Sequence, residues 1–73
     1  MTLAQADMSR PSRVLDFERI DEASELRLAS LGLYRGSVVT KILKTPLRDP
    51  VECLVGPQLV ALDAWLLERI IVE

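Results

Sequence analysis

Histidine is absent from this 73-residue chain, and cysteine, tryptophan, tyrosine and phenylalanine each occur once. Without histidine the chain cannot provide imidazole-based acid–base catalysis, a Ser-His-Asp triad or a zinc site that needs imidazole. A single cysteine, Cys53, excludes an internal disulfide, so no feature indicates an oxidising compartment. We therefore expect no catalytic residues, no cofactor and no metal site, and Cys53 is interpreted as a small core residue.

A basic excess and a long hydrophobic run are also absent. Nine Lys and Arg against eleven Asp and Glu leave a net charge of −2, which argues against a nucleic-acid partner. The longest uncharged stretch, Cys53 to Leu62, is far shorter than the roughly 20 residues that span a bilayer. The first residues lack the basic start and long apolar run of a signal peptide. We expect a cytoplasmic protein without direct membrane insertion.

The composition is that of one small folded domain covering residues 1–73, with 49% apolar and 27% charged residues. A domain of this size buries only about 60% of the surface that its unfolded chain exposes. Its stability margin is therefore thin, and a partner or self-association would add to it. Residues 1–13 are polar and without periodicity, so we expect them to be loosely ordered or ordered only by lying across the rest.

The apolar pattern predicts a mainly β protein. Strands are expected at residues 14–20, 37–45, 51–55, 59–62 and 70–72, and a turn at residues 46–50 between two prolines. The acidic residues from Asp21 to Glu25 suit the start of a short helix that ends before Gly32. A helical turn is expected after Asp63. About five short strands, one short helix and a C-terminal helical turn suggest a small, strongly bent sheet that closes into a barrel.

Three motifs in order carry a family resemblance. They are Arg27 to Ser37 (RLASLGLYRGS), Thr45 to Val51 (TPLRDPV) and the closing segment from Leu59 to Val72. Together they resemble the FeoA family of the bacterial ferrous iron transport system over about the whole chain. Departures from the family pattern include Arg35 in place of proline, Arg48 in place of glycine, and changes at Asp63 and Leu66-Leu67.

The resemblance implies an SH3-like β-barrel and a non-enzymatic accessory role, with the transition-metal association of the family. It also implies a partner, the membrane permease FeoB with its cytoplasmic GTPase domain, and so a place at the inner membrane through that partner. The alternative is a generic SH3-like interaction module related to the C-terminal domains of metal-dependent repressors. An enzyme is the weakest reading because no nucleophile and base are paired.

Two groups of residues are candidates for partner contact. In the loop from Leu31 to Gly36 the glycines suit positive φ, and Leu33, Tyr34 and Arg35 are expected to form its tip, since Tyr and Arg are frequent in interface hot spots. Near the C-terminus, the candidates are Trp65 and Leu67, because a run of four apolar residues cannot all face inward on one helical turn. A basic run at Arg35, Lys41, Lys44 and Arg48 is either a solvated face or a patch for an acidic partner.

Overall fold

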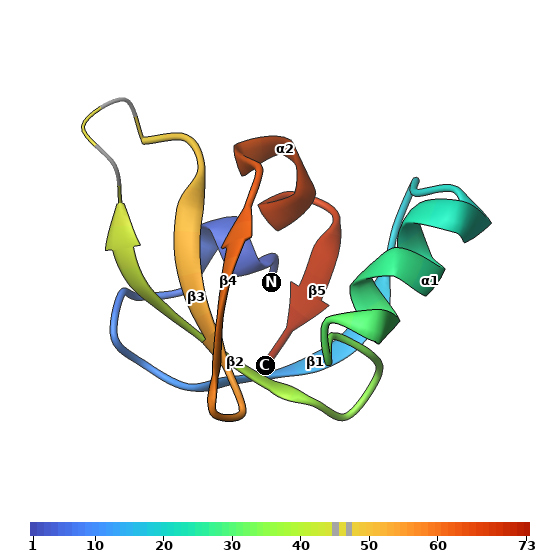
Figure 1. The fold of residues 1–73 in the computed structure, drawn as a ribbon, viewed down its shortest axis with the longest axis horizontal. Helices are drawn as coiled ribbons and strands as arrows, with labels where there is room; N and C mark the ends of the chain where they lie inside the picture. Colours follow the sequence, from blue (N-terminus) through green and yellow to red (C-terminus); the bar gives the residue numbers. More distant parts are fainter. Residues whose placement is uncertain (45, 47) are drawn as a thin grey trace.

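Short segments rich in β-branched residues form the strands of one sheet (Figure 1). The computed structural model describes residues 1–44, 46 and 48–73, and of residues 43 and 44 only the backbone. The strands are β1 (Ser12–Phe17), β2 (Val38–Lys44), β3 (Val51–Val55), β4 (Gln58–Leu62) and β5 (Ile70–Val72). The helices are the 3-10 helix η1 (Leu3–Gln5), α1 (Glu22–Ser30) and α2 (Ala64–Leu67). Within these ranges every helix is too short or too polar to cross a membrane.

The sheet is antiparallel throughout, in the order β4-β3-β2-β1-β5. This confirms the mainly β architecture, but the expected closure into a barrel is wrong. In the described ranges no ladder joins β4 to β5. The outer edge of β5 is occupied instead, because Val72 donates its amide to the Met1 carbonyl at 2.8 Å and Thr2 forms a bridge with Ile71. The N-terminal segment thus occupies the edge of β5 with which β4 would have to pair to close a barrel.

Two register shifts bend the sheet. One falls between Val14 and Asp16 in β1, and the other between Lys41 and Leu43 in β2. Such bulges increase the local twist and let the sheet curve around the core. β3 and β5 have the expected bounds, whereas β1 starts and ends earlier than predicted. Of the turn expected at residues 46–50, Leu47 lies outside the described residues, as does Thr45 before it.

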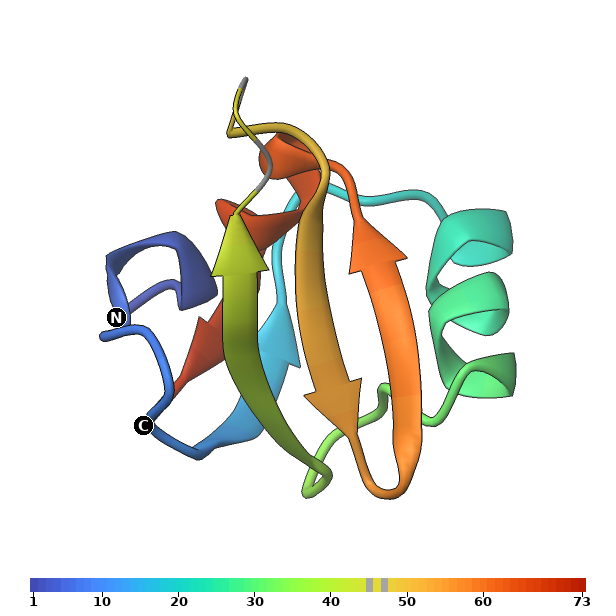
Figure 2. The same cartoon turned by 60° about the vertical axis from the view of Figure 1, so that its left-hand side comes forward.

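The core fills the concave side of the bent sheet. Its most deeply buried side chains come from every strand, from η1 and from the loop after α1: Leu3, Val14, Leu33, Val39, Cys53, Leu62, Ile70 and Val72. Figures 1 and 2 show α1 and η1 on opposite sides of the sheet. The helix α1 contributes Leu28 to the core, and α2 contributes Leu66 and Leu67.

The first nine residues are held against the sheet by both main-chain and side-chain contacts. Leu3 and Ala6 are buried. Lys41 of β2 is only 3% exposed, and its Nζ donates to the Ala4 carbonyl at 3.1 Å. The Ser9 amide donates to the Lys41 carbonyl. Lys41 therefore anchors this segment and cannot belong to the surface basic patch that the sequence suggested.

Candidate functional site

The loop between α1 and β2 is fixed at its start by the way α1 ends. The Leu33 amide donates to the Leu28 carbonyl at 2.9 Å, and the Gly32 amide donates to the Ala29 carbonyl at 3.0 Å. These two bonds, with Gly32 at φ +94°, form a Schellman motif. Leu33 and Leu28 both lie in the core. Leu33 is completely buried, so it supports the loop from inside and does not form its tip as the sequence suggested.

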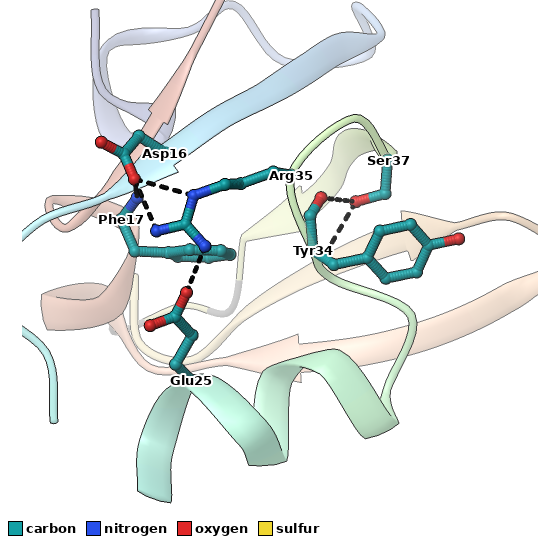
Figure 3. A network of polar contacts seen from close by, with 6 residues as sticks. All are labelled: Asp16, Phe17, Glu25, Tyr34, Arg35 and Ser37. Atoms are coloured by element: carbon teal, nitrogen blue, oxygen red, sulfur yellow. Dashed lines mark hydrogen bonds and ion pairs between the residues drawn. The ribbon is translucent and has the colours of Figure 1, made fainter. Parts of the chain in front are cut away.

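A tight turn then presents Tyr34 and Arg35 to solvent (Figure 3). The Ser37 amide donates to the Tyr34 carbonyl at 3.0 Å. The Ser37 hydroxyl accepts from the Tyr34 amide at 3.1 Å and donates to the Tyr34 carbonyl at 2.8 Å. Gly36 takes the positive φ required at the third position of the turn. This network holds the backbone of Tyr34, whose side chain is 55% exposed.

Arg35 joins three separate parts of the chain. Its Nε and Nη2 donate to Asp16 Oδ1 of β1 at 3.0 and 2.7 Å, and its Nη1 donates to Glu25 Oε1 of α1 at 2.5 Å. The guanidinium carbon lies 5.4 Å from the centre of the Phe17 ring. Figure 3 shows the guanidinium next to this ring. The hydrogen bond from the Phe17 amide, and then the one from Arg35, lower the pKa of Asp16. The same two carboxylates raise the pKa of Arg35, with Asp16 the larger cause.

The four basic residues of the suggested patch do not form one surface. Arg35 is engaged with Asp16 and Glu25, and Lys41 is buried. The side chain of Lys44 lies outside the described residues, and Arg48 is exposed in the loop before β3. The described residues therefore do not present a continuous basic face that would steer this protein to an acidic partner.

The second predicted contact region, α2, has one buried and one exposed side. Leu67 is buried, whereas Trp65 is 47% exposed. The Arg69 guanidinium lies 5.8 Å from the Trp65 ring centre, and its Nη1 donates to the Arg19 carbonyl at 2.7 Å. Arg69 therefore restrains Trp65 at the surface through a cation–π contact.

The five predicted contact residues thus divide into two groups. Tyr34 and Arg35 precede β2, and Trp65 follows β4. Because β2 and β4 both pair antiparallel with β3, these segments lie at opposite ends of the sheet, as Figures 1 and 2 show. Leu33 and Leu67 are core residues, one beneath each group.

A groove lies beside the Arg35 cluster, between α1 and the loop. It has a volume of about 330 Å³ and is lined by Phe17, Glu22, Glu25, Leu26, Ala29, Leu33, Tyr34 and Arg35. Sequence reasoning missed Asp16, Phe17, Glu25 and Leu26 as parts of this site. The one available signal was Arg35 itself, because a long charged side chain in place of a turn proline can reach partners outside the motif.

The described residues offer little for metal chemistry. Among them, no three His, Cys, Asp or Glu side chains come together in a way that could hold an ion. Cys53 is buried, and desolvation raises the pKa of its thiol to about 11, with the nearby Lys41 as a smaller opposing influence. A neutral, inaccessible thiol is a poor ligand and a poor nucleophile.

Asp49 caps α2 in place of Asp63. The Ala64 amide donates to Asp49 Oδ1 at 2.9 Å, whereas the side chain of Asp63 makes no capping hydrogen bond. The side-chain cap of α2 is therefore supplied from the loop before β3, fifteen residues before Ala64. This contact gives the aspartate of the Pro-Leu-x-Asp-Pro motif a structural role, because it fixes the helix that carries Trp65.

Replacing Asp49 with alanine is expected to lower the free energy of unfolding by about 1 kcal/mol, the typical value of a lost cap. Asp49→Asn keeps an acceptor oxygen and should recover most of the loss. Asp63→Ala is the matched control and should change stability by less than about 0.5 kcal/mol. Urea denaturation of the three variants measures these differences. A larger loss for Asp63→Ala than for Asp49→Ala would contradict the assignment.

Comparison with known proteins finds one matching family model and several solved structures with a similar fold. A model of the FeoA domain matches residues 1–73. The solution structure of iron(II) transport protein A from Clostridium thermocellum is 27% identical with a TM-score of 0.86. The match covers 100% of this chain and 44% of that one, so this chain spans less than half the length of that protein. Stenotrophomonas maltophilia FeoA, crystallised with zinc, is 25% identical with a TM-score of 0.80, covering 100% of this chain and 89% of that one.

The Stenotrophomonas protein is described as a procaryotic SH3 domain protein suggested to act as a ferrous iron transport activating factor. A manganese-dependent transcriptional repressor also matches, at 15% identity and a TM-score of 0.83, over 99% of this chain and 40% of that one. At that identity the likeness concerns the fold alone. No curated protein sequence matches this chain.

Proposed function

Because this chain belongs to the FeoA family, which is associated with ferrous iron transport, we propose that it is a non-enzymatic accessory protein of ferrous iron uptake. In this proposal it docks on the cytoplasmic side of a FeoB-type permease with a GTPase domain and modulates that permease. It would lie in the cytoplasm and reach the inner membrane through its partner.

The observation that carries the docking proposal is the exposed, fixed Tyr34. Tyr34 is more than half exposed. Its backbone amide and its backbone carbonyl are both hydrogen-bonded to the Ser37 hydroxyl. An aromatic side chain presented on an ordered turn loses little conformational entropy on binding, which is why such residues are frequent interface anchors. Trp65 is a second exposed aromatic of the same kind at the other end of the sheet.

The proposal predicts that this protein recovers FeoB from detergent-solubilised membranes when it is used as bait. Tyr34→Ala should reduce recovery at least about fivefold, since interface anchors contribute more than 1 kcal/mol. Leu59→Ala is the matched control, because Leu59 is 60% exposed on β4 and lines neither of the two hollows that Tyr34 lines. Trp65→Ala tests the second surface separately.

Guanine nucleotide is included in half of the samples. Dependence of recovery on nucleotide would indicate the GTPase domain as the docking site. Absence of FeoB in both conditions, with bait that has the circular dichroism of the folded protein, would contradict the accessory role. It would favour the generic SH3-like interaction module instead.

A further inference from the structure

The groove beside Arg35 has one wall made by a single face of α1. Glu22, Glu25, Leu26 and Ala29 recur at intervals of three, one and three residues, so they form one stripe along the helix. Tyr34 and Arg35 form the facing wall, and Phe17 and Leu33 contribute from the core side. At about 330 Å³ the groove is at the small end of ligand pockets, a size for side chains of a partner more than for a whole cofactor.

The stripe of α1 that lines this groove is not covered by the rest of the described chain. Leu28 is the buried residue of the helix, on a different face. Leu26 is 65% exposed, the largest exposure among the big apolar side chains of the described residues. With Tyr34 across the groove, Leu26 leaves apolar surface open on both walls. An aliphatic side chain placed between them would remove this surface from water.

The charge around the groove is negative despite Arg35. The Nε, Nη1 and Nη2 groups of Arg35 already donate to Asp16 and Glu25. Asp16 and Glu25 pair with Arg35, and Glu22 also lines the groove, so these four side chains together carry a net charge of −2. Glu22 is exposed and has no ionic partner among the described residues.

We propose that this groove binds a segment of the partner protein that is both apolar and basic. Its aliphatic or aromatic side chain lies between Leu26 and Tyr34, and a neighbouring lysine or arginine pairs with Glu22 and the outer side of Glu25. Only the identity of the partner as FeoB rests on the proposed function. The recognised chemistry is the opposite of the acidic surface that Arg35 suggests from sequence, because Arg35 is neutralised within the protein.

The first test compares binding of detergent-solubilised FeoB to charge-reversal variants of the full chain. Glu22→Lys is expected to weaken binding about tenfold, because it places a cation beside the incoming one. Asp7→Lys makes the same change of charge sign on a side chain that is 78% exposed in the N-terminal segment, outside both proposed contact regions, and it should leave binding within about twofold. Equal losses for both variants, or a loss for Asp7→Lys alone, would overturn the groove assignment. Unchanged binding by both would overturn it while leaving the accessory role intact.

The second test does not need FeoB. A synthetic amphipathic helix of leucine and lysine is titrated into the isotope-labelled protein, and amide chemical shifts are followed by NMR. Shifts concentrated at Phe17, Leu26 and Tyr34, and reduced in Glu22→Lys, support the proposal even if FeoB is not recovered. The leucine and glutamate counterpart of the peptide should cause no such shifts. No localised shift up to about 1 mM lysine peptide, or equal shifts with both peptides, would overturn it.

Discussion

Leu33→Ala is expected to lower the free energy of unfolding by about 2–5 kcal/mol, the range measured for truncating a fully buried leucine. Leu33 has no exposed surface, and it closes the Schellman motif that links α1 to the sheet. For a 73-residue domain the total stability is roughly 4–11 kcal/mol. This one substitution would therefore remove a large share of it.

Urea denaturation followed by circular dichroism and by the fluorescence of the single tryptophan, Trp65, measures the loss. Leu26→Ala is the matched control, since that leucine is exposed in the neighbouring helix and should change stability by less than about 0.5 kcal/mol. If Leu33→Ala does not fold, Leu33→Met should still fold and lose under about 1.5 kcal/mol. Similar losses for Leu33→Ala and Leu26→Ala would show that Leu33 is not a core residue.

Gly32→Ala is the second large effect, expected at about 1–3 kcal/mol. The backbone of Gly32 has φ +94°, a conformation that costs energy for any residue with a Cβ atom. A Cβ added there would also meet Val55 Cγ1 at 3.1 Å, closer than ordinary van der Waals contact. The Val55 side chain, or the backbone that carries it, would have to move by a few tenths of an ångström to relieve it.

Gly36→Ala separates the two causes. Gly36 has a nearly identical φ of +97°, but no atom lies within 4 Å of the position that its Cβ would occupy. Thermal or urea unfolding of both variants should therefore show a larger loss for Gly32→Ala, and the difference measures the contact with Val55. A loss for Gly36→Ala equal to or above that of Gly32→Ala would mean that backbone strain alone limits substitution at both sites.

Arg35 occupies the second position of its turn, where the family pattern has proline. Proline suits that position because its ring fixes φ in advance. In this chain the Ser37 hydroxyl stabilises the turn from both ends, and the side chain at position 35 is available for other contacts. The substitution thus exchanges a rigid turn residue for a link between β1 and α1. Both side chains of the Arg35–Asp16 pair are more than half exposed, so the link positions the loop and adds little to overall stability.

Local patterns determined the order and type of the elements. Alternation placed β3, β4 and β5 to within a residue, and Gly32 marked the end of α1. The three motifs, read together, were enough to place the chain in the FeoA family. These features follow from residues that are neighbours in sequence, where periodicity and turn chemistry act directly. The same reasoning placed exposed aromatic residues at positions 34 and 65, since a short helical turn or tight loop cannot bury every apolar side chain it carries.

Only the tertiary structure decided which charged groups meet. The Arg35–Asp16 contact spans 19 residues, the Lys41–Ala4 contact 37 and the Asp49–Ala64 contact 15. Each depends on strand register, and the bulges in β1 and β2 shift that register by an amount that no local pattern reveals. For this reason the sequence suggested a basic surface at Arg35 and Lys41. In the fold, one of these cations is neutralised by two carboxylates and the other is buried, because the bent sheet brings α1 and the N-terminal segment against them.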